Sequence, residues 1–140
     1  MSKQKLILDD DGYNYFVLAI SCHLKDFRVA WFINRQCKLN LSRCEMELKL
    51  KSGESLSVPF FLHTDSDARL RYVLLPNHTE DFTLVRDLKS FDYFMIVEGY
   101  LPLFNQNDFI AKLRQTEAIQ HIELVSSKHI EPYQYLIFEN

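Results

Sequence analysis

Residues 93–97, which read Tyr-Phe-Met-Ile-Val, constrain the fold of this chain more than any other feature. They follow a turn-like stretch, 84–92, in which polar and apolar residues are mixed. Successive side chains of a strand point to opposite faces, so a strand made of these five residues has no polar face to turn toward water. The sequence therefore predicts a central strand that other elements cover on both faces.

Length and composition predict one globular domain spanning residues 1–140. A chain of this size buries roughly 68–70% of the surface that it exposes when unfolded, which is enough for a sizeable core. Aromatic residues make up 14% of the sequence and glycine occurs only three times, which argues against a disordered, collagen-like or low-complexity chain. No internal repeat or flexible linker divides the sequence.

The net charge of −3 argues against a protein that coats nucleic acid or an anionic membrane as a whole. The first apolar run is only three residues long, at 6–8, which is too short for a secretory signal. No 18 apolar residues run together, so we expect no membrane-spanning helix and no membrane partner. Cys22, Cys37 and Cys44 form no C-x-x-C pair and are odd in number, which predicts reduced thiols and a cytoplasmic location.

The amino-terminal half predicts a strand followed by a helix. Residues 13–22 are rich in aromatic and β-branched side chains and follow the turn-like stretch 9–12, which is typical of a strand. Asp26 is expected to cap the next segment, an amphipathic helix. Its apolar residues recur at helical spacing: Val29, Ala30, Ile33 and Cys37.

The middle of the chain predicts a three-strand meander. Apolar and polar residues alternate over 46–50 and again over 56–62, on either side of a turn at Ser52 and Gly53. A second polar turn, 64–67, leads into another alternating stretch that ends at Pro76.

The last third predicts a short helical turn at 85–89, the central strand, a helix and a further strand. Asn105 or Asn107 is expected to cap the helix. Its apolar stripe consists of Phe109, Ile110 and Leu113. Residues 122–124 suggest the further strand, and residues 133–138, which follow Pro132, predict a final edge strand.

This order of elements contains the β-α-β-β-α-β pattern of ferredoxin-like domains, with one strand inserted and the tail strand appended. We therefore predict an α+β fold. It is a two-layer sandwich in which a mostly antiparallel sheet carries the helices on one face.

One segment resembles a known family motif. Residues 85–93 read Val-Arg-Asp-Leu-Lys-Ser-Phe-Asp-Tyr and resemble the motif Ile-Pro-Glu-x-x-x-Val-Asp-Tyr, which names the bacterial IPExxxVDY family. Residues 5–11 and 23–31 also resemble the amino-terminal half of that family, so the similarity covers most of the chain. Asp92 and Tyr93 match the named motif positions. Four positions differ: Val85, Arg86, Asp87 and Phe91. The resemblance implies a bacterial cytosolic protein and no established activity.

The same segment has a physical interpretation as a structural junction. Asp87 lies in the predicted helical turn, and Asp92 can accept hydrogen bonds from free backbone N–H groups of the connection. Tyr93 opens the buried strand with its hydroxyl at the rim of the sheet. A catalytic Asp-Tyr pair is the alternative, but no second carboxylate or histidine at a telling spacing supports it.

No pattern in the sequence predicts a cofactor or a metal. Asp9, Asp10 and Asp11 are suited to a hard cation but lack the acidic residue that a calcium loop requires at its twelfth position, so we interpret them as a turn. The five histidines form no H-x-x-x-H or H-E-x-x-H pair, and no glycine-rich phosphate loop or G-x-S-x-G is present. A Cys22–His nucleophile pair assembled in space is an alternative to a simply buried thiol.

The predicted helix carries a basic stripe about 140° wide at 3.6 residues per turn. Its members are Lys25, Arg28, Arg35 and Lys38, with Arg43 shortly after, and Asp26 is the only acid among them. Such a stripe is either the solvated side of an amphipathic helix or a docking face for an acidic partner.

Two classes of function follow. The first, which we favour, is a non-enzymatic binding module that engages an acidic protein through this stripe; RNA is a weaker alternative, because no aromatic RNA-binding pattern is present. The second is a small enzyme or ligand-binding domain with a site near Tyr72, Asp92, Tyr93 and one or more histidines. The sequence leaves the oligomeric state open.

Overall fold

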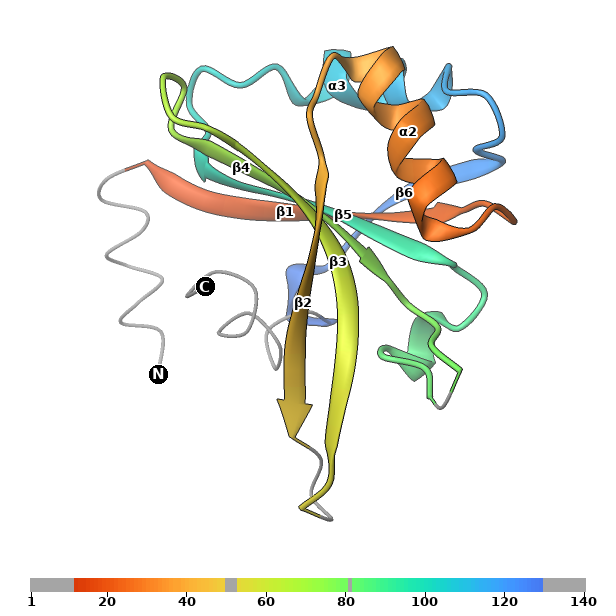
Figure 1. The fold of residues 1–140 in the computed structure, drawn as a ribbon. Helices are drawn as coiled ribbons and strands as arrows, with labels where there is room; N and C mark the ends of the chain where they lie inside the picture. The colour runs from red at the N-terminus through yellow and green to blue at the C-terminus, as the bar shows by residue number, and fades with distance from the viewer. Residues whose placement is uncertain (1–11, 50–52, 81, 130–140) are drawn as a thin grey trace.

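The computed structural model describes residues 12–49, 53–80 and 82–129, which form one six-stranded sheet and two α-helices (Figure 1). The strand order is β2-β3-β4-β5-β1-β6, and every neighbouring pair is antiparallel. Along the chain the elements are β1 (Tyr13–Ser21), α2 (Asp26–Cys37), β2 (Ser42–Lys49), β3 (Ser55–Asp65), β4 (Leu70–Pro76), the 3₁₀ turn η1 (Arg86–Leu88), β5 (Tyr93–Tyr100), α3 (Gln106–Arg114), β6 (His121–Val125) and the 3₁₀ turn η2 (Ser127–His129). The predicted α+β class is confirmed.

Strand β5 is the covered central strand that the sequence predicts. It lies between β4 and β1, with Tyr93 opposite Pro76 on one side and Ile20 on the other. All five side chains from 93 to 97 are buried. Tyr93, Met95 and Val97 belong to one apolar cluster, whereas the two residues between them belong to a second. The sheet therefore has a core on each face.

Both helices lie over the same face of the sheet (Figure 1). Helix α2 buries Val29, Ala30 and Ile33 there, and α3 buries Phe109 and Leu113, in agreement with the predicted apolar stripes. Because the apolar stripe of α2 packs in the core, the opposite side of this helix faces solvent.

The other face is covered in part by the connection between β4 and β5. Leu84, Val85 and Phe91 from this connection are buried in the second cluster, together with Phe94 and Ile96 of β5. A segment that looks like a polar turn in the sequence is therefore anchored to the sheet by three apolar side chains.

The ends of the helices agree with the sequence at one position and differ at another. Asn105 caps α3, because its Oδ1 accepts a hydrogen bond from the Asp108 N–H at 3.0 Å. The expected cap of α2 by Asp26 is wrong, since Lys25 is the capping residue and makes no side-chain cap. Asp26 is instead the first helical residue, where a carboxylate still favours the positive end of the helix dipole.

The remaining predicted elements are also present where the structure describes them. The meander corresponds to β2, β3 and β4, the helical turn to η1, and the strand at 122–124 to β6. The expected edge strand at 133–138 and the acidic run Asp9 to Asp11 lie outside the described residues.

Removing a side chain from either face of β5 should destabilise the fold. Met95→Ala and Phe94→Ala each leave a cavity in a different core, and each should lower the free energy of unfolding by about 2–5 kcal/mol in urea titrations. Leu103→Ala, at a side chain that is 88% exposed, is the control and should change it by less than about 0.5 kcal/mol. A small effect for one of the two buried residues would show that its face of the sheet is open.

Candidate functional site

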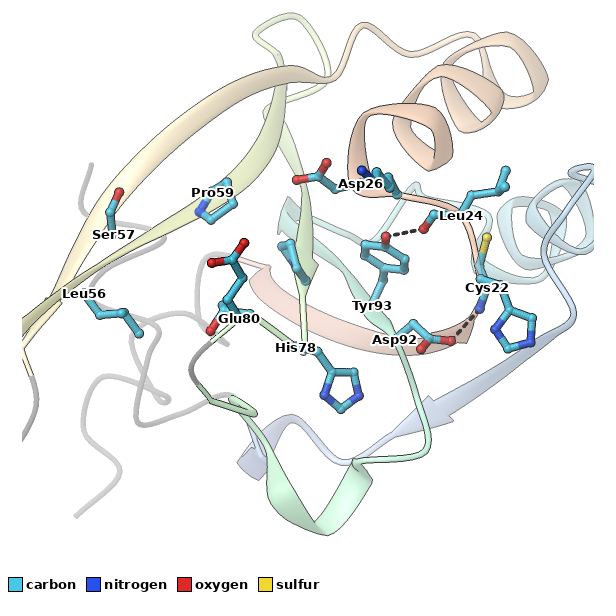
Figure 2. A pocket seen from close by; sticks show the side chains of 14 residues that line it. Cys22, Leu24, Asp26, Leu56, Ser57, Pro59, His78, Glu80, Asp92 and Tyr93 are labelled. Atoms are coloured by element: carbon cyan, nitrogen blue, oxygen red, sulfur yellow. Dashed lines mark hydrogen bonds between the residues drawn. The ribbon is translucent and has the colours of Figure 1, made fainter.

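A cavity of about 630 Å³ opens where β1 ends and β5 begins, and we call it the β3–β4 groove (Figure 2). It is bounded by β3, by the end of β4 and the residues after it, by the start of β5, and by the connection from β1 to α2. The lining residues are Cys22, His23, Leu24, Lys25, Asp26, Leu56, Ser57, Pro59, Pro76, His78, Thr79, Glu80, Asp92 and Tyr93.

The groove exists because β3 and β4 separate. They pair from Asp65 opposite Leu70 to Phe61 opposite Leu74, and there the ladder stops. Continuing the same register would place Pro59 opposite Pro76. Proline has no backbone N–H, so neither residue can donate to a ladder at this point. Beyond it β3 stays paired with β2 while β4 stays paired with β5.

Two hydrogen bonds join the start of β5 to the connection after β1. The Cys22 N–H donates to Asp92 Oδ2 at 2.8 Å, and the Tyr93 hydroxyl donates to the Leu24 carbonyl at 2.5 Å (Figure 2). Asp92 therefore bonds a backbone N–H, but this N–H belongs to the connection after β1 and not to the local turn that the sequence suggested. Asp87, the third residue of the predicted junction, is exposed in η1.

A residue that sequence reasoning missed, Asn77, organises the connection between β4 and β5. Its side chain is fully buried, and its Nδ2 donates to the carbonyls of Leu88 and Phe91 at 3.0 and 2.9 Å. Its Oδ1 accepts from the Val85 N–H at 2.8 Å. The backbone N–H of Asn77 also donates to the Asp92 carbonyl at 2.9 Å. Asparagine after a strand usually indicates an exposed turn, so no local signal distinguishes this buried one.

The two histidines at the groove differ in whether their ring nitrogens are already hydrogen-bonded. His78 uses both ring nitrogens within its own connection, with Nδ1 3.0 Å from Thr83 Oγ1 and Nε2 2.8 Å from the Lys89 carbonyl oxygen. It therefore holds the connection in place rather than facing a ligand. His23 is exposed beside the buried Cys22.

The carboxylates give the groove its charge. Figure 2 shows the Asp26 and Glu80 carboxylates pointing into the space between β3 and Tyr93. Asp92 is the third carboxylate of the lining, and Lys25 is its one lysine. With neutral histidines, the described lining therefore carries more negative than positive charge.

Burial disfavours the ionised form of two side chains of the groove, Cys22 and Tyr93. Burial raises the pKa of the Cys22 thiol. A backbone hydrogen bond from Leu24 lowers this pKa by less than burial raises it, and the nearby Asp92 adds a still smaller upward effect. Burial also raises the pKa of Tyr93 well above its usual range, and the charge of Asp26 adds to this. A buried neutral thiol is poorly suited to nucleophilic catalysis, so this geometry favours binding over a Cys22–His nucleophile pair.

Tyr72 does not join Asp92 and Tyr93. It pairs with Val97, four residues further along β5, and its ring packs against Phe104 and Phe109 beneath the helices. The predicted three-residue set is therefore not assembled, and only its last two members line the groove. Within the described parts of the chain, no three His, Cys, Asp or Glu side chains gather in a way that could hold a metal ion.

A second surface lies on the solvent side of α2, and we call it the basic–aromatic face. Its members are exposed and lie opposite the buried stripe: Lys25, Phe27, Arg28, Trp31, Arg35 and Lys38. The aromatic pair was missed by the sequence analysis, although residues four apart on a helix lie on the same side. Phe27 is 59% exposed and Trp31 is 52% exposed. The Arg35 guanidinium lies 4.9 Å from the centre of a Trp31 ring, a cation–π contact.

Arg43, the last residue of the predicted basic stripe, lies apart from this face. It is on β2, where its Nη2 forms an ion pair with Glu45 Oε2 at 3.1 Å. Its charge is therefore already partnered. A small hollow of about 290 Å³ adjoins the face, between Trp31 and Arg35 on one side and Gln115 and Glu117 on the other.

Comparison with known proteins gives no match, either to a protein-family model or to a curated protein. No helix in the described ranges is long and apolar enough to cross a membrane. The three cysteines are free.

Replacing Asn77 should damage the fold more than its polar character suggests. Asn77→Ala removes three side-chain hydrogen bonds. The Phe91 carbonyl and the Val85 N–H lose their side-chain partner in a buried site, whereas the Leu88 carbonyl still accepts from the Phe91 N–H. We expect a loss of about 2–4 kcal/mol in the free energy of unfolding, measured in urea. Asn107→Ala, at an exposed position of α3, is the matched control and should be nearly neutral. Equal stability of the two variants would contradict the assigned role of Asn77.

Proposed function

We propose that this protein is a non-enzymatic binding module whose basic–aromatic face docks an acidic segment of a partner protein. The observation that supports this most strongly is the exposure of Phe27 and Trp31 among four cationic side chains on one side of α2. The core does not require these aromatic rings, because α2 already buries its other side.

The composition of the face is typical of the centre of a protein interface. Tryptophan and arginine are enriched among residues that contribute most to binding, whereas lysine is more common at the rim. Arg35 is held over Trp31, so its guanidinium is partly ordered before a partner arrives. Carboxylates of a partner would meet cations whose attraction also speeds association.

The exposed rings favour one alternative, an RNA whose bases stack on Phe27 and Trp31. The net charge of −3 makes this the weaker candidate, because phosphate binding depends on accumulated positive charge. The groove beside Asp92 and Tyr93 supports the other alternative, a small ligand or substrate.

We also propose the finer features that the sequence suggested. The order β4-β5-β1-β6, with α2 and α3 in the two crossovers, supports a ferredoxin-like core in a two-layer sandwich, to which β2 and β3 are added. The free thiols support a cytoplasmic location. The pairing of Asp92 and Tyr93 with the connection after β1 gives those two motif residues a structural role consistent with the IPExxxVDY family.

Charge reversal on the face should abolish partner capture. The full chain, the double variant Arg28→Glu/Arg35→Glu and the control Arg86→Glu/Lys128→Glu are used as baits in a lysate of the source cells. Both variants change the net charge equally, and all four positions are exposed. We expect wild type and control to recover the same acidic protein, and the purified partner to bind the face variant at least about tenfold more weakly.

Two outcomes would contradict the proposal. Equal recovery by all three baits would remove the basic–aromatic face from the interaction. Loss of the recovered material on nuclease treatment would show that the partner is a nucleic acid.

A further inference from the structure

We propose that the β3–β4 groove receives an extended peptide segment of a partner, which pairs with the free edge of β3 and places a lysine or arginine side chain between Asp26 and Glu80. This site adjoins the basic–aromatic face, since Lys25 lines the groove and also belongs to that face. It requires a partner of the opposite charge.

One edge of β3 has no strand partner beside the groove in the part of the chain that the structure describes. Residues 55–60 pair with β2 on one side, but their other edge has no strand partner in the described chain, because the ladder to β4 ends at Phe61. Six residues of strand span about 20 Å, which is long enough for several backbone hydrogen bonds. Free strand edges of this kind are sites where extended peptides add to a sheet.

Two prolines stand where β3 and β4 separate. With Pro59 and Pro76 at the point of separation, β3 and β4 cannot close the gap by pairing with each other. Figure 2 shows Pro59 of β3 and Tyr93 of β5 on opposite sides of the groove. The opening is therefore fixed by the sequence of both strands.

The carboxylates of the groove suit a positively charged side chain. Asp26 and Glu80 reach into the groove from opposite walls, one from the start of α2 and one from the connection after β4 (Figure 2). Asp92 Oδ2 and Asp26 Oδ1 each accept one backbone hydrogen bond, from the Cys22 N–H and the Phe27 N–H. Asp92 is turned toward Cys22, so Asp26 and Glu80 are the carboxylates best placed to meet a ligand in the groove (Figure 2). A lysine or arginine between them would form charge-assisted hydrogen bonds with both.

Part of the groove lining is apolar and forms its floor. Pro59, Pro76 and Leu56 line the groove next to the buried Tyr93 ring. An extended peptide presents alternate side chains to such a floor and its backbone to β3 at the same time. A compact small molecule would leave the edge of β3 to water.

The test uses the full chain and a phage-displayed library of random nine-residue peptides as the probe. We expect selected peptides to carry lysine or arginine among β-branched residues. A selected synthetic peptide should shift the backbone amide resonances of residues 55–60 and of Tyr93 in nuclear magnetic resonance spectra. N-methylation of alternate backbone amides of the peptide should abolish binding, since it removes donors without changing the protein.

Matched variants separate this proposal from the previous one. Asp26→Asn/Glu80→Gln should weaken peptide binding at least about tenfold, because both charge partners are lost. The control Asp67→Asn/Glu123→Gln removes two exposed carboxylates elsewhere and should leave the affinity within about twofold. Arg28→Glu/Arg35→Glu should also keep it, so failure of one proposal does not imply failure of the other.

Any of four results would overturn the proposal. The library yields no binder, the selected peptides lack basic residues, or the shifted amides lie outside the groove. Unchanged binding of an N-methylated peptide would also overturn it, because the peptide would then not pair with β3.

Discussion

The lack of any polar face on β5 is the constraint on which the rest of this structure depends. A strand that presents Tyr, Phe, Met, Ile and Val to both sides is stable only inside a sheet whose two faces are covered. The chain meets this demand with α2 and α3 over one face and with the connection between β4 and β5 against the other. Both surfaces to which we assign binding follow from this arrangement.

The first consequence concerns the helices. Because one side of α2 is used to cover Met95 and its neighbours, the other side is free to carry residues that the fold does not need. Two aromatic rings at that position expose apolar area that a purely solvated helix face would lack. Their combination with four cations is what distinguishes this face from an ordinary polar one.

The second consequence concerns the start of β5. Asn77 and Asp92 hold the entry to this strand through hydrogen bonds to backbone groups of two connections. These contacts fix one wall of the β3–β4 groove, and the facing prolines keep the other wall apart. Burial raises the pKa values of Cys22 and Tyr93, so these two side chains of the wall add no charge to that of its carboxylates.

The sequence predicts those features that depend on the periodicity of apolar residues. The stripe of α2 and the alternation in β3 have such a period, whereas the buried run at 93–97 is recognised by its uninterrupted apolar residues, and each was located correctly. Asn105 was also predictable, because capping acts within one turn of the helix. The fold class follows from these elements in order.

Features that depend on contacts between distant segments could not be predicted. In the sequence Asn77 is typical of a turn, and only the folded structure places the Leu88 and Phe91 carbonyls next to its side chain. The meeting of Pro59 with Pro76 requires the register of two strands, which the sequence alone does not provide. Tyr72 was placed in one predicted site with Tyr93, whereas strand pairing separates them along β5. Asp26 was misplaced by one residue as a cap, an error that no apolar pattern could correct.

Native-state hydrogen exchange distinguishes a fully covered β5 from an exposed one. If β5 is covered on both faces and paired on both edges, the amides of residues 94–97 exchange only when the whole domain unfolds. Their free energy of exchange should then equal the free energy of unfolding measured in urea. Exchange of these amides as fast as that of the edge strand β6 would contradict the account.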